Sequence, residues 1–309
     1  MKPEASGEGP AAATRCGFVA LIGAPNVGKS TLVNALVGAK VTIVSRKVQT
    51  TRALIRGIIV EDNAQLVLVD TPGIFAPKRR LDRAMVLTAW TGAHDADLVC
   101  VLLDAKLGID AEADIILTTL ANVAHPKILV INKIDLVPRE KLLALAKAAN
   151  DRLKFEDTFM ISALSGDGIG DLRQALARLV PAGPFHYPED QMSVAPLRHL
   201  AAEITREKIF QQLHQELPYQ STVETDSWTD RKDGSVRIEQ TIFVERESQR
   251  KIVLGKGGAT IKSIGAEARK EIAEITGQTV HLFLFVKVRE NWGDDPDRYR
   301  EMGLEFPKE

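Results

Sequence analysis

The stretch GAPNVGKS at residues 23–30 decides the fold of the first half of this chain. It fits the pattern G-x-x-x-x-G-K-[ST], it follows the apolar run FVALIG, and a helical pattern begins at Lys29. Glycines let backbone N–H groups approach phosphate oxygens, and the helix N-terminus adds the positive end of its dipole. Lys29 is suited to the β- and γ-phosphates, and the Ser30 hydroxyl is suited to Mg²⁺. The stretch therefore predicts a phosphate-binding loop between a strand and a helix. Nucleotide contacts are expected from Gly23, Asn26, Val27, Gly28, Lys29, Ser30 and Thr31.

Short apolar runs alternate with helical patterns between residue 17 and about residue 180. The runs are FVALIG, ALIRGIIVE, AQLVLVD, LVCVLLD, KILVIN and FMISA, with helical stretches such as residues 29–37, 110–121 and 140–153 between them. This alternation predicts an α/β fold with a mostly parallel sheet and helices on both faces. Only Asp62 and Asn63 separate ALIRGIIVE from AQLVLVD, which predicts a hairpin and therefore a mixed sheet.

Composition limits the class of protein. The chain has 309 residues, a formal net charge of −1 and 45% apolar residues. The length predicts two domains, and the apolar content and charge balance exclude a disordered chain and one that is basic throughout. No apolar run approaches the ~20 residues of a membrane-spanning helix. Cys16 and Cys100 lie in apolar runs and are predicted to be buried, as suits a reducing cytosol.

The sequence also predicts how the chain is divided. We expect a disordered tail at 1–15, a nucleotide domain at 16–180, a proline-rich linker at 181–196 and a second domain at 197–309.

The sequence DTPG at residues 70–73 ends a second apolar run. We expect Asp70 to hold the Mg²⁺ shell and the Gly73 N–H to reach a γ-phosphate, because glycine permits close approach of the backbone. Residue 74 is Ile, where signalling GTPases carry a glutamine that orients the attacking water. Three ways to complete the site remain: another protein group, a monovalent cation such as K⁺ with an oxygen from Asn26, or a partner.

The sequence NKID at residues 132–135 follows the run KILVI. The Asp135 carboxylate can accept from the N1–H and the exocyclic amine of guanine together, whereas adenine offers no such donor pair. Asn132 and Lys133 are expected to brace neighbouring loops and to cover the base. The backbone N–H groups of Ser162, Ala163 and Leu164 are expected to reach guanine O6.

The polar segment SRKVQTTR at residues 45–52 lies between these motifs. A hydroxyl there can join Mg²⁺ when a γ-phosphate is present and leave after hydrolysis. Thr51 is the preferred ligand and Thr50 the alternative. Catalytic roles are therefore expected of Lys29, Thr51 and Gly73, and Mg²⁺ coordination of Ser30, Thr51 and Asp70.

The second domain carries a different glycine loop, GKGG at residues 255–258. Two strand patterns precede it, helical segments flank it, and the strand pattern VHLFLFVKV follows. This order predicts an α+β KH domain of type II, whose G-x-x-G loop approaches the backbone of unpaired nucleotides. Residues 246–270 have a net charge of +5, which favours RNA. RNA contacts are expected from Lys251, Gly255, Lys256, Gly257, Gly258 and Lys262, whereas the phenylalanines of the last strand are predicted to pack in the core.

Taken together, GAPNVGKS, SRKVQTTR, DTPGI, NKID, SAL and FVERESQRKIVLGKGGATIKSIGAEARK resemble the Era family of bacterial GTPases with a C-terminal KH domain. The resemblance runs from about Cys16 to the C-terminus. It implies a monomeric cytoplasmic protein, with some inner-membrane association, that binds 16S ribosomal RNA near its 3′ end and assists assembly of the small ribosomal subunit. It also implies that GTP favours the RNA-binding state, that hydrolysis favours release, and that the Mg²⁺-linked threonine lies in residues 49–51.

Two other functions compete with this one. The first is a GTPase switch whose C-terminal domain binds a protein or a membrane. The second is an ATP-dependent enzyme such as a kinase, against which Asp135 argues. The six histidines lack metal-ligand spacing, so we predict no structural metal.

Overall fold

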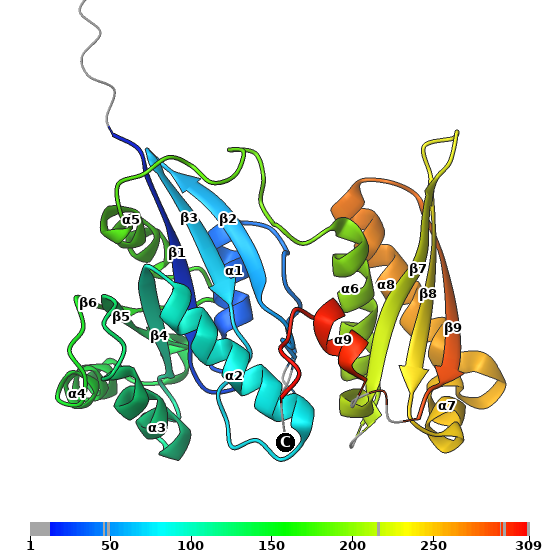
Figure 1. The fold of residues 1–309 in the computed structure, drawn as a ribbon, viewed down its shortest axis with the longest axis horizontal. Coiled ribbons are helices and arrows are strands. Elements are labelled where there is room, and N and C mark those ends of the chain that lie inside the picture. Colours follow the sequence, from blue (N-terminus) through cyan, green and yellow to red (C-terminus); the bar gives the residue numbers. More distant parts are fainter. Residues whose placement is uncertain are drawn as a thin grey trace, which may run out of the picture.

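The computed structural model describes residues 13–45, 47, 50–214, 217–290, 292 and 295–307 (Figure 1). Residues 1–12 of the expected tail lie outside these ranges, and Arg15 already belongs to the first strand. Within the described ranges, no helix is long and apolar enough to cross a lipid bilayer.

A six-stranded mixed sheet forms the first domain. Its strands are β1 (Arg15–Ile22), β2 (Ile55–Glu61), β3 (Ala64–Asp70), β4 (Leu98–Asp104), β5 (Lys127–Asn132) and β6 (Asp157–Met160). Their order is β2-β3-β1-β4-β5-β6, and all neighbours are parallel except β2 and β3. The predicted hairpin is thus confirmed, with Asp62 at φ 51° in its turn. Every residue of β3 and β4 is buried, as expected for strands covered on both faces.

Helices cover both faces of this sheet. They are α1 (Lys29–Val37), α2 (Arg80–Asp95), α3 (Ala111–Leu120), α4 (Arg139–Asn150) and α5 (Ile169–Leu179). Helices α1 and α5 contact β2 and β3, while α2 lies across the other face and contacts β1 (Figure 1). Strand β1 lies between β3 and β4, so β2 and β3 are added on one side of it and β4, β5 and β6 on the other. The loops that follow β1, β3, β5 and β6 all start at the carboxyl edge of the sheet, where ligands bind in such folds.

The second domain is a three-stranded sheet backed by helices. Its strands are β7 (Ser221–Asp230), β8 (Val236–Val244) and β9 (Val280–Val288), and its helices are α6 (Leu197–Gln212), α7 (Glu247–Leu254) and α8 (Ala259–Thr276). Strands β8 and β9 are parallel, whereas β7 and β8 are antiparallel. Helix α6 ends at Gln212, and a short turn, η2 (Leu217–Gln220), precedes β7.

The prediction that the β9 phenylalanines pack in the core is wrong for both of them. Phe283 and Phe285 are 40% and 48% exposed, and they alternate with Leu282 and Leu284, which pack against the core clusters. Alternation along a strand places only one set on the helix-covered face, and here the leucines take it.

The linker is held against the first sheet. The Ile58 N–H donates to the Met192 carbonyl at 2.9 Å, and the Val194 N–H donates to the Arg56 carbonyl at 3.2 Å. These bonds pair the linker with the outer edge of β2, which fixes the point where α6 begins.

The C-terminal segment returns to the first domain, which no sequence pattern indicated. It contains α9 (Pro296–Glu301), drawn in red between α2 and α6 in Figure 1. Trp292, Tyr299 and Leu304 form a buried apolar cluster with Leu81 and Met85 of α2. The two domains are therefore joined at the linker and again through this segment.

Candidate functional sites

The phosphate-binding loop joins β1 to α1 and encloses the Lys29 side chain. The Lys29 Nζ atom donates to the carbonyls of Gly23 and Ala24, each at 3.0 Å. Burial lowers the pKa of Lys29 to about 8, and Asp70 opposes this shift. The buried ammonium can exchange these neutral acceptors for charged phosphate oxygens, which bind it more strongly.

Two glycines near this loop leave no room for a side chain. A Cβ atom at Gly28, whose φ is 102°, would lie 2.3 Å from Asn132 Nδ2. A Cβ atom at Gly73 would lie 2.8 Å from Pro25 Cα. The DTPG segment thus touches the backbone of the phosphate-binding loop at Pro25.

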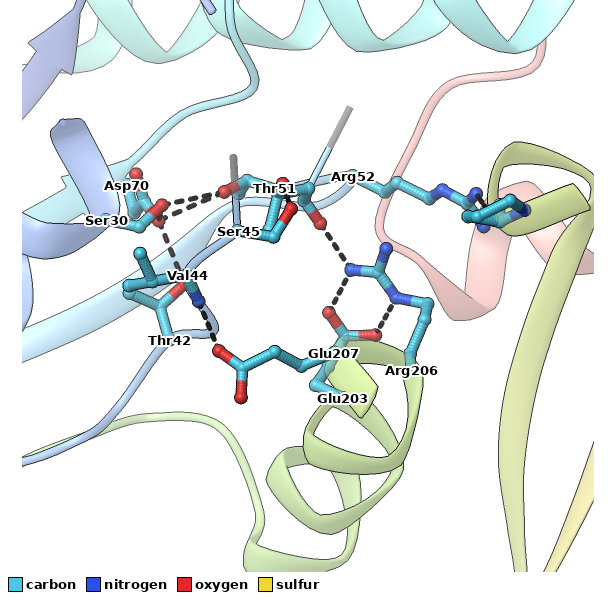
Figure 2. Close-up of polar contacts among 12 residues, drawn as sticks. Ser30, Thr42, Val44, Ser45, Thr51, Arg52, Asp70, Glu203, Arg206 and Glu207 are labelled. Carbon is cyan, nitrogen blue, oxygen red and sulfur yellow. Dashed lines mark hydrogen bonds and ion pairs between the residues drawn. The ribbon is translucent and has the colours of Figure 1, made fainter. Parts of the chain in front are cut away.

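The three expected Mg²⁺ ligands meet at one point (Figure 2). The Ser30 hydroxyl donates to Asp70 Oδ2 at 2.7 Å, and it lies 2.9 Å from Thr51 Oγ1. The Thr51 hydroxyl lies 3.3 Å from the same carboxylate oxygen. Burial raises the pKa of Asp70, while hydrogen bonding from Ser30 opposes the shift. Three oxygen donors that converge in this way suit a hard divalent cation.

The Asp70 carboxylate also reveals a residue that the sequence did not single out. The Thr42 hydroxyl donates to Asp70 Oδ2 at 3.0 Å and is buried. In contrast, Asp70 Oδ1 is buried without a hydrogen-bond partner among the described residues. Such an atom is costly unless a ligand or water satisfies it, so the site is built to receive one. In the sequence, Thr42 could have been noticed only as a hydroxyl residue in the loop after α1.

The structure separates the two candidate threonines. The Thr50 hydroxyl donates to the Lys47 carbonyl at 2.7 Å and lies 2.8 Å from Ser45 Oγ. Thr51 faces Ser30 and Asp70 instead. The geometry therefore favours Thr51 as the ligand.

The Asn132 side chain braces three loops, as expected. Its Nδ2 atom donates to the Val27 carbonyl at 2.8 Å, and its Oδ1 atom accepts from the Ala163 N–H at 3.0 Å. The Ala163 N–H is thus engaged with Asn132 in this structure. Ser162 is buried beside it, while Leu164 is 86% exposed.

Lys133 links the same loops from the other side. Its Nζ atom donates to the Asn26 carbonyl and to Asp104 Oδ2, each at 2.6 Å. The sequence did not single out Asp104, which lies at the end of β4. Asp135 follows in a short helical turn, η1 (Ile134–Leu136), with its carboxylate exposed. A ligand at this edge can therefore reach it.

Ile74 is buried, and its N–H donates to the Gly23 carbonyl at 3.2 Å. Its apolar side chain cannot orient a water molecule. The side chain of Asn26 is exposed on the phosphate-binding loop, where the residue adopts φ 62°.

The second glycine loop joins α7 to α8. Gly255, Gly257 and Gly258 have φ values of 73°, 60° and 79°, which favour glycine. A Cβ atom at Gly255 would lie 2.2 Å from Thr260 Oγ1, whereas nothing lies within 4 Å of one at Gly257 or Gly258. The loop is therefore open on the side where a chain of nucleotides can approach. Lys251, Lys256 and Lys262 are all exposed around it.

Two sequence-family models match this chain. One described as a 50S ribosome-binding GTPase matches residues 18–133, and one described as a KH domain matches residues 216–293. With the geometry above, they define a P-loop GTPase joined to a KH domain. The chain is 83% identical over 97% of its length to GTPase Era of a Bradyrhizobium species, of which it covers 98%. It is 82% identical over the full length of both chains to GTPase Era of Bradyrhizobium diazoefficiens. The chain belongs to the Era family of GTPases, and it hydrolyses GTP.

Solved structures of Era share the whole architecture. A point variant from Aquifex aeolicus bound to GDP·AlF4⁻ is 36% identical and covers 94% of this chain and 99% of its own, with a TM-score of 0.88. The same values hold for Era in complex with MgGDPNP and nucleotides 1506–1542 of 16S ribosomal RNA.

Proposed function

We propose that this GTPase binds small-subunit ribosomal RNA near its 3′ end and assists assembly of the small ribosomal subunit. GTP favours the RNA-bound state and hydrolysis favours release. The observation that carries the proposal is the presence, in one chain, of an enclosed phosphate-binding loop and an open G-x-x-G loop. The related Era crystallised with MgGDPNP and 16S ribosomal RNA supports it.

The nucleotide's phosphates are assigned to residues 23–31. Lys29 contacts the β- and γ-phosphates, and the Gly73 N–H contacts the γ-phosphate. Ser30, Thr51 and Asp70 suit Mg²⁺ because they present three oxygens within 3.3 Å of one another and a further buried, unpaired oxygen on Asp70. When bound, the ion would neutralise negative charge on the nucleotide's phosphates.

The base is assigned to the loops after β5 and β6. Asp135 accepts from guanine N1–H and its amine, and Lys133 covers the ring. Asn132 holds the loops of Val27 and Ala163 together at 2.8 and 3.0 Å, which fixes the shape of the pocket. Backbone N–H groups of residues 162–164 are assigned to guanine O6.

Orientation of the attacking water is assigned to groups other than residue 74. The Asn26 side chain would supply an oxygen ligand to K⁺ at the phosphate-binding loop. Turnover that is equal in potassium and sodium chloride, or that keeps its potassium dependence in Asn26→Ala, would contradict this assignment.

The RNA is assigned to residues 255–258 of the unit at 197–309, with the nucleotide held by the unit at 16–180. The N-terminus of α8 follows the loop and attracts phosphate, and exposed Lys251, Lys256 and Lys262 add positive charge. The alternative, a C-terminal domain that binds a protein or a membrane, is less favoured because the KH family matches residues 216–293.

The decisive measurement is the affinity of the full chain for a labelled RNA with the sequence of the 16S 3′ end, by fluorescence anisotropy. We expect tighter binding with a non-hydrolysable GTP analogue than with GDP, and affinity that falls steeply with salt. The double variant Lys256→Asp/Gly257→Asp should lose RNA binding and keep GTP hydrolysis measured without RNA. Unchanged RNA affinity in this variant would rule out the G-x-x-G assignment.

The monomeric state, the cytoplasmic location and peripheral contact with the inner membrane are proposed from the family resemblance. Light scattering of the purified protein and fractionation of cells test them directly.

A further inference from the structure

The loop that carries Thr51 is fastened to the second domain by α6. We call residues 42–45, 47 and 50–52, the described part of this segment, the Thr51 loop. The Val44 N–H donates to Glu207 Oε1 at 2.8 Å, and the Arg206 guanidinium donates to the carbonyl of Thr50 (Figure 2). Both acceptor and donor belong to α6, more than 150 residues from the loop in sequence. Thr50 directly precedes Thr51, so the second contact fixes the backbone at the ligand itself.

Arg206 is held rigidly enough to act as a fixed donor. Its Nε atom donates to Glu203 Oε1 at 2.8 Å, and a second guanidinium nitrogen pairs with Glu203 Oε2. Its side chain is 1% exposed, and the guanidinium lies 5.2 Å from the ring centre of Phe210. Burial alone would raise the pKa of Glu203, but Arg206 holds it below its usual range. A two-point arginine–carboxylate pair of this kind fixes the direction of the remaining donors.

The residue after Thr51 is anchored to the same domain. The Arg52 guanidinium donates to the carbonyls of Ser221 at 2.9 Å and Tyr219 at 3.1 Å. It also lies 6.0 Å from the ring centre of Phe210 and 5.5 Å from that of Trp292. Burial, together with the nearby Arg206, lowers the pKa of Arg52 to about 9. Thr51 is thus held from both sides by groups of the second domain.

Two buried arginines near each other are a poor source of stability, because taking charges out of water is costly. They do fix geometry, and geometry decides how Thr51 acts. Its hydroxyl must stay at the 2.9 Å and 3.3 Å separations from Ser30 and Asp70, and a displacement of about 1 Å at such a site costs up to 100-fold in rate.

We propose that Arg206 and Glu207 of the second domain are positioning residues for GTP hydrolysis, because they hold the Thr51 loop in the conformation that presents Thr51 to Mg²⁺ and the γ-phosphate. The inference rests on the proposed roles of Thr51 and Mg²⁺. It makes the second domain part of the hydrolytic machinery even without RNA.

The test compares Arg206→Gln, Arg206→Lys and the matched control Arg198→Gln in the full chain without RNA. Arg198 also lies on α6 and donates to a backbone carbonyl, that of Thr225 at 2.9 Å, which belongs to β7 of the second domain and not to the Thr51 loop. We expect Arg206→Gln to lower kcat about tenfold, which equals about 1.4 kcal/mol in the barrier.

Affinity for a GTP analogue should fall while affinity for GDP stays within about twofold, because GDP lacks the γ-phosphate that Thr51 is proposed to contact through Mg²⁺. Arg206→Lys should recover part of the rate, and Arg198→Gln should match the wild type.

A wild-type kcat in Arg206→Gln would overturn the inference, as would equal losses of GDP and GTP-analogue affinity in a folded protein. Absence of hydrolysis in the wild type would instead contradict the GTPase assignment, so the two failures are distinguishable.

A second pair of variants decides the question if Arg206→Gln does not fold. Glu207→Gln keeps an oxygen that can accept from the Val44 N–H, whereas Glu207→Ala removes it. We expect a lower kcat and faster hydrogen exchange at residues 42–45 in the alanine variant only. Equal rates in the two variants would overturn the positioning role.

Discussion

The two glycine loops of this chain, residues 23–30 and 255–258, both lead into a helix but differ in their surroundings. In the first loop, the fold leaves no space beside Gly28, and Lys29 is buried. In the second loop, Gly257 and Gly258 border open space, and Lys256 is exposed. An enclosed loop can surround one small ligand, whereas an open loop can hold a few nucleotides of a chain that continues past it. Similar glycine-rich sequences thus suit two kinds of phosphate ligand because the tertiary environment differs.

The largest expected effect is on the enclosed loop. Lys29→Met should weaken GTP binding by roughly 100-fold, since a buried charge-assisted bond is worth up to about 3 kcal/mol. Titration with a fluorescent GTP analogue measures this. The exposed Lys141→Met on α4 is the control, and it should bind as the wild type does. Similar GTP affinities for Lys29→Met and Lys141→Met would show that the buried charge of Lys29 does not contribute to nucleotide binding.

A methyl group can be placed in each loop. Gly28→Ala should also weaken nucleotide binding, because the new Cβ would lie 2.3 Å from Asn132 Nδ2 in a backbone at φ 102°. Gly257→Ala meets no neighbouring atom within 4 Å and costs only about 1–2 kcal/mol of left-handed backbone strain. Nucleotide affinity of the first variant, and RNA affinity with thermal melting of the second, test this. A loss of folding in Gly257→Ala would show that its loop is less open than the geometry indicates.

A single charge in the open loop should have a smaller effect. Lys256→Gln should weaken RNA binding about equally for different sequences and reduce the slope of log affinity against log salt by about one. GTP hydrolysis without RNA should not change. An unaltered salt slope would mean that Lys256 does not contact phosphate.

The smallest expected effect is a change in proton uptake. Burial lowers the pKa of Lys29 in the nucleotide-free protein to about 8 from the usual 10.5. Above pH 8 the amine is mostly neutral, and phosphates must recruit a proton to bind its charged form. GTP binding at pH 9 should therefore take up close to one proton, with lower affinity than at pH 7, where uptake from this group is nearly absent. Calorimetry in buffers of different ionisation enthalpy measures it, and equal proton uptake at both pH values would argue against the shift.

The same group affects the free energy of unfolding with the opposite sign. Because the folded pKa of Lys29 lies below the unfolded one, the unfolded chain binds more protons between pH 8 and about 10.5. Lys29 therefore makes the nucleotide-free protein more stable as pH rises through this window.

Much of the candidate site could be predicted because its motifs are local. Glycine, lysine and hydroxyl residues at fixed spacing predict a phosphate-binding loop from a short segment alone. The apolar runs around them predicted the sheet. The β9 phenylalanines were less predictable, because leucine and phenylalanine alternate along that strand and both types can be core residues. Thr42 and Asp104 could not be predicted as site residues, because each lies outside the motifs. Thr42 gains its role from its hydrogen bond to Asp70, and Asp104 from its ion pair with Lys133.

Short-range sequence patterns predict the two domain classes, the phosphate-binding loop and the G-x-x-G loop, because each is encoded by residues close together in the chain. The packing of the domains brings Thr51 rather than Thr50 to Ser30, and it lets Arg52 and Arg206 join the Thr51 loop to the second domain. A polar residue in a loop looks the same in sequence whether it meets water or a carbonyl 169 residues away. Only packing of the two domains decides between them.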